Sequence, residues 1–199
     1  MPDLMSPPET QAKMGITYIC NEMCTDPYET FKLQILSHLL FEGPNSTFYK
    51  SIIEEGVAPN YCPGYGYDFT TRQSTFTVGV QGIETKDFPK IEKQITEALV
   101  RASKEGFEKK LFLTVLHQLE FAAKKTKPHI GLGYLAHMVP LCLHGGDPLS
   151  FFKVDEYSKR VRQEFEKGGL FEGLIQKYLL DNTHHLRLFM TPNAKLAAQ

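Results

Sequence analysis

The sequence lacks the features that would assign it at once to a nucleic-acid-binding or membrane class. Lysine and arginine number 22 against 23 aspartate and glutamate, so neither sign of charge is in excess. A balanced charge gives no electrostatic footprint for nucleic acid or an anionic membrane surface. No apolar run reaches membrane length, and the first thirty residues contain no charged segment followed by an apolar core. We therefore expect no nucleic-acid partner, no membrane partner and no targeting segment in this chain.

Cysteine is also scarce and irregularly spaced. The chain has four cysteines, at positions 20, 24, 62 and 142, which do not form a disulfide framework. A cluster of Cys20, Cys24 and Cys62 with His144 would lack the second C-x-x-C or H-x-x-x-H half of a zinc finger. Buried or half-buried free thiols in a reducing compartment are the simpler interpretation.

Several common site motifs are missing as well. The sequence contains no G-x-S-x-G and no P-loop, and Gly131-x-Gly133 lacks the rest of a dinucleotide fingerprint. His184 and His185 are adjacent at the start of an expected strand, so they point to opposite faces and cannot jointly bind one ion. These absences remove the usual nucleotide-binding and serine-hydrolase classes.

The stretch from Gly43 to Ile83 organises the rest of the chain. Gly43-Pro44 interrupt the preceding segment, and Asn45 or Ser46 offers a cap for a short helix that ends near Gly56. A glycine- and tyrosine-rich turn follows over residues 61–67. Apolar and polar residues then alternate over residues 75–80, which predicts a half-buried strand.

Further strands and helices are expected on both sides of this stretch. Residues 14–20 are rich in β-branched and aromatic residues, and residues 185–190 alternate, so both segments predict strands. Asp26-Pro27 predict a helix start, with aspartate as the cap and proline in the first position. The other amphipathic helices are expected over residues 87–106 with Asp87 as cap, 108–125, 147–167 with Asp147 as cap, and 170–180.

Residues 130–143 differ from these helices because they are apolar on nearly every side. This pattern predicts a buried helix that is bent or broken at Pro140. The order of elements is strand, helices, one or two strands, several helices, strand. It predicts an α+β fold in which helices cover one face of a mostly antiparallel sheet.

The central stretch also carries a family resemblance. Pro44-Asn45-Ser46-Thr47-Phe48-Tyr49-Lys50, Gly66-Tyr67, Thr71-Arg72 and Val78-Gly79-Val80-Gln81-Gly82-Ile83 resemble the presequence protease family. Gly106-Phe107-Glu108, His117 with Glu120, and Gly146-Asp147-Pro148 follow in the family's order. These proteins are large pitrilysin-type zinc metallopeptidases that degrade mitochondrial targeting peptides. The segment that this chain resembles is the second, non-catalytic domain of the N-terminal half.

The family's zinc site is an H-x-x-E-H motif on a helix, in which two histidines bind zinc and the glutamate activates water. The nearest run here is His117-Gln118-Leu119-Glu120-Phe121, where phenylalanine replaces the second histidine. His38 lies on the helix that bears the motif in the catalytic domain, but the neighbouring motif positions are aliphatic or aromatic. We therefore expect no catalytic residue and no metal ligand in this chain, and the resemblance assigns zinc to the parent enzyme only.

Tyr67 and Arg72 are the candidate substrate-binding residues. The resemblance places an arginine and a tyrosine near the matching strands of the C-terminal half, where they reach the substrate backbone. An equivalent pair here would line the enclosed chamber without completing the catalytic site. A structural salt bridge of Arg72 is the favoured alternative.

We therefore predict a pitrilysin/LuxS-like metallohydrolase domain over residues 14–192, with a disordered lead-in over 1–13 and a truncated linker over 193–199. The resemblance implies a chamber-wall domain of a zinc metalloendopeptidase that degrades targeting peptides and other short unfolded peptides in the mitochondrial matrix. Its expected partners are the neighbouring zinc-binding domain and an unfolded peptide, and self-association is expected through the exposed domain interface.

Two alternatives remain open. The chain could be a free-standing, non-enzymatic scaffold or interaction module of the same fold, which a reading frame limited to these residues would favour. It could also be an independent hydrolase that uses His117 and Glu120, in which case replacing His117 by alanine would abolish the activity.

Overall fold

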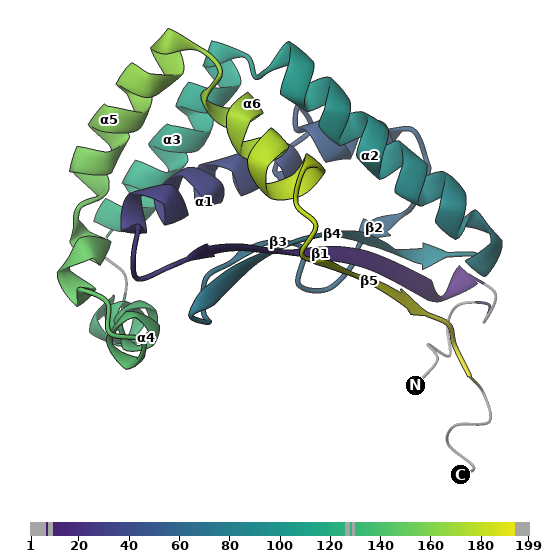
Figure 1. Cartoon of the computed structure of the whole chain (residues 1–199), viewed down its shortest axis with the longest axis horizontal. Coiled ribbons are helices and arrows are strands. Elements are labelled where there is room, and N and C mark those ends of the chain that lie inside the picture. Colours follow the sequence, from purple (N-terminus) through teal and green to yellow (C-terminus); the bar gives the residue numbers. More distant parts are fainter. Residues whose placement is uncertain (1–6, 8–9, 126–127, 129, 194–199) are drawn as a thin grey trace.

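A computed structural model describes residue 7, residues 10–125, residue 128 and residues 130–193 of the chain. One antiparallel sheet forms its frame, with strand order β2-β4-β1-β5 and with β3 also paired to β4 (Figure 1). The long central strands are β1 (Ala12–Glu22) and β4 (Gln73–Ile83). The shorter ones are β2 (Asn60–Tyr61), β3 (Gly66–Asp68) and β5 (His185–Met190).

The period-two pattern of the two long strands places their apolar residues on one face of the sheet. Met14 pairs with Val80, and Ile16 pairs with Val78. All four side chains are buried. Gly79 allows β4 to lie close to β1, because a Cβ there would lie 2.3 Å from the Met14 carbonyl oxygen of β1. The strand predicted over residues 75–80 is confirmed, and β4 extends beyond it in both directions.

A layer of helices lies on the apolar side of the sheet (Figure 1). It comprises α1 (Pro27–Phe41), α2 (Phe88–Glu105), α3 (Lys109–Lys124), α5 (Val154–Lys167) and α6 (Leu170–Ile175). The cap of α1 is the predicted one, since Asp26 Oδ1 accepts a hydrogen bond from the Glu29 amide at 2.9 Å. The α+β fold with helices on one face of an antiparallel sheet is therefore confirmed.

Three local predictions differ from the structure. Asp87 makes no side-chain capping bond, and a 3₁₀ turn, Thr85–Asp87, precedes α2 instead. Ser46 Oγ donates to the Gly43 carbonyl, and the short helix continues as a π-helical segment, Tyr49–Glu54. Residues 147–167 do not form one helix: a 3₁₀ turn, Pro148–Phe152, precedes α5.

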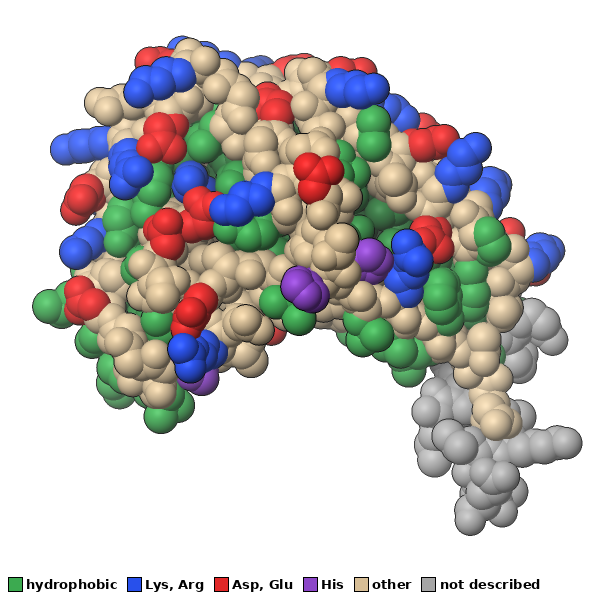
Figure 2. All heavy atoms as spheres, in the orientation of Figure 1, with side chains coloured by type: hydrophobic (Ala, Val, Ile, Leu, Met, Phe, Trp, Pro, Cys, Tyr) green, Lys and Arg blue, Asp and Glu red, His purple; other side chains and the backbone are tan. Residues whose placement is uncertain are grey.

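The prediction of a buried helix over residues 130–143 is wrong. The helix forms as α4 (Ile130–Leu143), with Pro140 inside it, but only Leu141 is buried. Leu132 is 70% exposed and Leu143 is 76% exposed. Figure 2 shows hydrophobic side chains gathered at the end of the molecule where α4 lies. An apolar sequence specified the helix here, but nothing in the described part of the chain covers its outer side.

The first strand begins slightly earlier than predicted, because β1 starts at Ala12 rather than at residue 14. Most of the predicted lead-in and nearly all of the predicted linker lie outside the described residues. In the described part of the chain, no helix combines the length and the apolar character needed to cross a bilayer.

Candidate functional site

His38 stands on α1, where its imidazole is already engaged by a neighbouring carboxylate. His38 Nδ1 lies 2.7 Å from Glu42 Oε2, one helical turn further on. The intervening Leu39, Leu40 and Phe41 are buried in the core and offer no metal-binding atoms. The helix therefore keeps its place in the fold with a single histidine.

The His117–Glu120 pair on α3 is arranged for structure rather than for metal binding. His117 Nδ1 lies 3.7 Å from Glu120 Oε2, and the histidine side chain is 70% exposed. Arg162 Nη2 of α5 donates to both oxygens of Glu120, at 3.1 and 3.2 Å. Since the Arg162 guanidinium binds both carboxylate oxygens of Glu120, this ion pair links α3 to α5. The geometry gives no support to a hydrolase built on this pair.

The described residues do not fit a zinc ion. Among them, no group of three or more histidine, cysteine, aspartate or glutamate side chains is placed to hold a metal. The four cysteines are free. Burial raises the pKa of the Cys20 thiol to about 12, which disfavours the thiolate that zinc requires.

Tyr67, the first candidate substrate-binding residue, is held on β3 by two hydrogen bonds. Its hydroxyl donates to Asn21 Oδ1 at 2.6 Å, and its amide donates to Ser37 Oγ at 3.0 Å. Burial raises the pKa of the Tyr67 phenol, so the hydroxyl stays protonated and available to donate. Gly66 permits this approach, because a Cβ there would lie 2.7 Å from Ser37 Oγ.

Arg72, the second candidate, lies at the surface just before β4. Its Nε donates to Glu22 Oε1, which gives the salt bridge favoured as the alternative. The side chain remains 67% exposed, so most of its guanidinium faces solvent. Tyr67 and Arg72 therefore bind consecutive residues, Asn21 and Glu22, at the end of β1.

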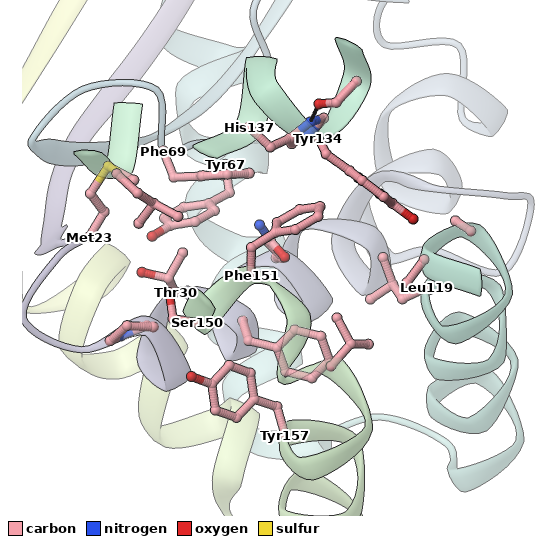
Figure 3. Close-up of a pocket in the computed structure, with 18 of the residues that line it drawn as sticks. Met23, Thr30, Tyr67, Phe69, Leu119, Tyr134, His137, Ser150, Phe151 and Tyr157 are labelled. Carbon is pink, nitrogen blue, oxygen red and sulfur yellow. Dashed lines mark hydrogen bonds between the residues drawn. The ribbon is translucent and has the colours of Figure 1, made fainter. Parts of the chain in front are cut away.

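A pocket of about 580 Å³ opens beside Tyr67, between α1, α3, α4 and the segment that leads into α5 (Figure 3). Its walls are mainly aromatic and aliphatic, and Figure 3 shows Phe151 projecting into the space below Tyr67 and Phe69. The aromatic side chains that line it are Phe31, Tyr67, Phe69, Tyr134, Phe151 and Tyr157. This volume lies within the range typical of small-ligand sites.

The polar groups of this pocket come from several elements. His137 on α4 uses Nδ1 to contact the Gly133 carbonyl oxygen at 2.8 Å. Gln34 on α1 and Lys125 after α3 also line the pocket. Sequence reasoning missed this site, because its walls come from segments more than one hundred residues apart. The only local signals were the Phe151-Phe152 pair and the spacing of Tyr134 and His137 by one helical turn.

The chain is similar in sequence to a known protein family and to several known proteins. The model of the peptidase M16 inactive domain matches residues 2–119. The mitochondrial presequence protease of Schizosaccharomyces pombe is 34% identical over 96% of this chain, and that of Danio rerio is 32% identical over 98%. In each case the chain spans only 19% of the relative's length.

Solved structures agree on the fold. An inactive peptidase domain from Bordetella parapertussis superposes with a TM-score of 0.72 at 13% identity, covering 92% of both chains. A protease from Helicobacter pylori gives a TM-score of 0.66 at 14% identity, covering 92% of this chain and 42% of its own. Together with the family model, which matches more than half of the residues, these findings show that the chain belongs to the peptidase M16 inactive domain family.

Proposed function

We propose that this chain is a chamber-wall domain of a zinc metalloendopeptidase of the presequence protease kind. The observation that carries the proposal is the similarity to two mitochondrial presequence proteases along nearly the whole chain, combined with an α1 that has no second histidine beside His38. The neighbouring domain would hold the zinc and cleave the peptide. This chain would enclose unfolded peptides and pack against that domain.

The proposed substrates are mitochondrial targeting peptides and other short unfolded peptides, and the proposed compartment is the mitochondrial matrix. The names of the relatives, which are mitochondrial presequence proteases, support targeting peptides as substrates and the mitochondrion as the compartment. The fold alone would not distinguish these substrates from others, because one fold can serve many functions.

Within this function, Arg72 and Tyr67 are the proposed peptide contacts. Arg72 keeps donor groups beyond the one that binds Glu22, and a guanidinium can hold the carbonyl oxygens of an extended peptide. Tyr67 would contribute its ring, since its hydroxyl is already bound to Asn21. We expect the arginine to bind substrate and the tyrosine to shape the surface around it.

The proposal is tested with a chimera of the Schizosaccharomyces pombe presequence protease in which this chain replaces the matching segment. We expect the chimera to bind zinc and to cleave a fluorogenic targeting peptide, while the isolated chain does neither. A folded, zinc-loaded chimera without cleavage would contradict the wall role. Stoichiometric zinc and chelator-sensitive cleavage by the isolated chain would overturn the non-catalytic assignment.

The substrate contact is tested in the same chimera. Arg72→Ala should raise KM about threefold with little change in kcat, because it removes binding that substrate and transition state share. Arg187→Ala is the matched control, since Arg187 on β5 is another exposed arginine that forms a salt bridge, in this case with Glu92. Equal effects of the two variants would remove Arg72 from the substrate site.

A free-standing scaffold is the second candidate function. The exposed apolar side of α4 favours it, because large exposed apolar surfaces mark interaction sites. A transcript that encodes only these residues would support the scaffold, and a reading frame that continues on both sides would exclude it.

A further inference from the structure

We propose that the pocket between α1, α3 and α4 binds an apolar group that ends in a carboxylate, such as a fatty acid or the C-terminal residue of a peptide. The inference concerns the pocket alone and does not depend on the proposed function. Its volume of about 580 Å³ accommodates an acyl chain or an aromatic side chain with its backbone carboxylate. Nothing in the family comparisons assigns a ligand to this place.

The body of the ligand is indicated by the walls. Phe31, Phe69 and Phe151 present apolar rings, and Met23 adds a flexible thioether at the end near the sheet (Figure 3). Phe151 is braced from α4 by Tyr134 and His137, with ring centroids 5.7 and 5.4 Å away. Rings fixed in this way offer aromatic and aliphatic groups a preformed surface.

The head group is indicated by the charges of the lining. Among the described residues that form the pocket, no aspartate or glutamate occurs, whereas Lys125 is one of them, with its Nζ 5.6 Å from the centroid of the neighbouring Phe121 ring. Gln34 also lines the pocket, and its side-chain amide carries N–H donors. A carboxylate is the group that an ammonium and an amide N–H would bind together.

Acidic groups near the pocket define the orientation of the ligand. Burial raises the pKa of the Tyr157 phenol, and the nearby negative charges of Glu156, Asp26 and Asp147 raise it further. Glu42 is paired with His38 and offsets any charge on that imidazole. A carboxylate would be repelled from both places, so the head group belongs near Lys125 and the apolar body near Phe151.

The test measures binding of matched probes to the 199-residue chain, which builds its own hydrophobic core. Decanoate is compared with decanamide and decylamine, and N-acetyl-leucyl-phenylalanine is compared with its C-terminal amide, by calorimetry and NMR shift mapping. We expect at least one acid to bind about fivefold more tightly than its neutral amide, and decylamine to bind most weakly, because an exposed ion pair contributes a factor of this size. Preference for decanoate would identify an acyl chain as the source, and preference for the peptide acid would identify a peptide terminus.

Two lysine variants separate the pocket from general surface charge. Lys125→Met should remove the preference for the acid and leave the amide's affinity unchanged. Lys124→Met is the matched control, because Lys124 forms a salt bridge with Asp155 at 2.7 Å and does not line the pocket. Both lysines are exposed, so neither change threatens folding.

A third variant tests the apolar wall. Phe151→Ala should weaken the acid and the amide by the same factor, and circular dichroism would verify that the variant is folded. The proposal is overturned if no probe binds at millimolar concentration, if amide or amine binds as well as acid, or if Lys124→Met and Lys125→Met have equal effects.

Discussion

Helices α2 and α4 differ in the way that matters most for this domain. In α2, Ile91, Ile95 and Leu99 share one face and are buried against the sheet layer, while the other faces are charged. Helix α4 is apolar all round, yet it buries only Leu141 and contacts mainly the Pro148–Phe152 turn. An amphipathic pattern identifies both the helix and the side that the core covers. A uniformly apolar pattern identifies neither the element that the helix packs against nor how deeply the helix is buried.

The largest expected effect contrasts one residue from each helix. Ile95→Ala in α2 should lower the free energy of unfolding by about 2–5 kcal/mol, because it leaves a cavity in a fully buried position. Leu135→Ala in α4 should change it by less than about 0.5 kcal/mol, since Leu135 is 57% exposed. Urea denaturation followed by circular dichroism measures both values. Equal losses would mean that α4 is packed into the core after all.

Thiol reactivity sharpens the same contrast with a large effect on rate. Cys142 on α4 is exposed, whereas Cys20 on β1 is half-buried and has its pKa raised by burial to about 12. Iodoacetamide near pH 8 should therefore alkylate Cys142 at least about a hundredfold faster than Cys20, because the thiolate is the reacting form. Peptide mass mapping over time gives both rates. A protected Cys142 would contradict the exposure of α4, and denatured protein supplies the control in which both cysteines react.

A smaller effect tests a link within the packed layer. Glu29 of α1 pairs with Lys32 and Lys177, and it accepts a hydrogen bond from the Tyr178 hydroxyl at 3.0 Å. Burial alone would raise the pKa of Glu29, but the hydrogen bonds from these three partners outweigh it and lower the pKa. The stabilisation is therefore complete above the unfolded-state pKa and is lost as pH falls through the lowered folded-state value.

Glu29→Gln should cost about 1–3 kcal/mol at neutral pH and flatten the decline of stability between pH 5 and pH 3. Urea denaturation across that pH range measures the effect. Glu105→Gln at the exposed end of α2 is the control and should keep the wild-type profile. An unchanged acid profile in Glu29→Gln would show that other carboxyl groups dominate the acid sensitivity.

The sequence predicted most of the fold because most of its signals are local. Asp26-Pro27 specify a helix start because the Asp26 carboxylate accepts a hydrogen bond from the Glu29 amide, and the alternation over residues 75–80 specifies which face of β4 is buried. The sequence predicted that Arg72 forms a salt bridge, but it did not identify the partner. Its partner, Glu22, lies fifty residues earlier and follows from strand pairing.

The candidate pocket could not be predicted in this way. Its walls combine Met23 and Gln34 with Tyr134 and Phe151, which lie on separate elements. No residue spacing within one segment predicts that these side chains lie close together. The error at residues 130–143 has a related cause. An apolar run without periodicity indicates a hydrophobic surface. Whether that surface is buried depends on a second element that packs against it, and the run itself does not identify that element.

The smallest expected change in stability tests what covers α4. Leu135 and Val139 stand one helical turn apart on its exposed side, away from the pocket. Replacing both by glutamine should alter the free energy of unfolding by less than about 0.5 kcal/mol, because neither side chain is part of the core. If the self-association expected from the sequence uses this exposed apolar surface, the same change should weaken it, and sedimentation velocity over a concentration series measures the effect. If wild type and variant associate equally, copies of the chain do not meet through α4. If wild type alone associates, this helix is the contact between copies. A neighbouring domain of a longer chain would then compete for the same side chains.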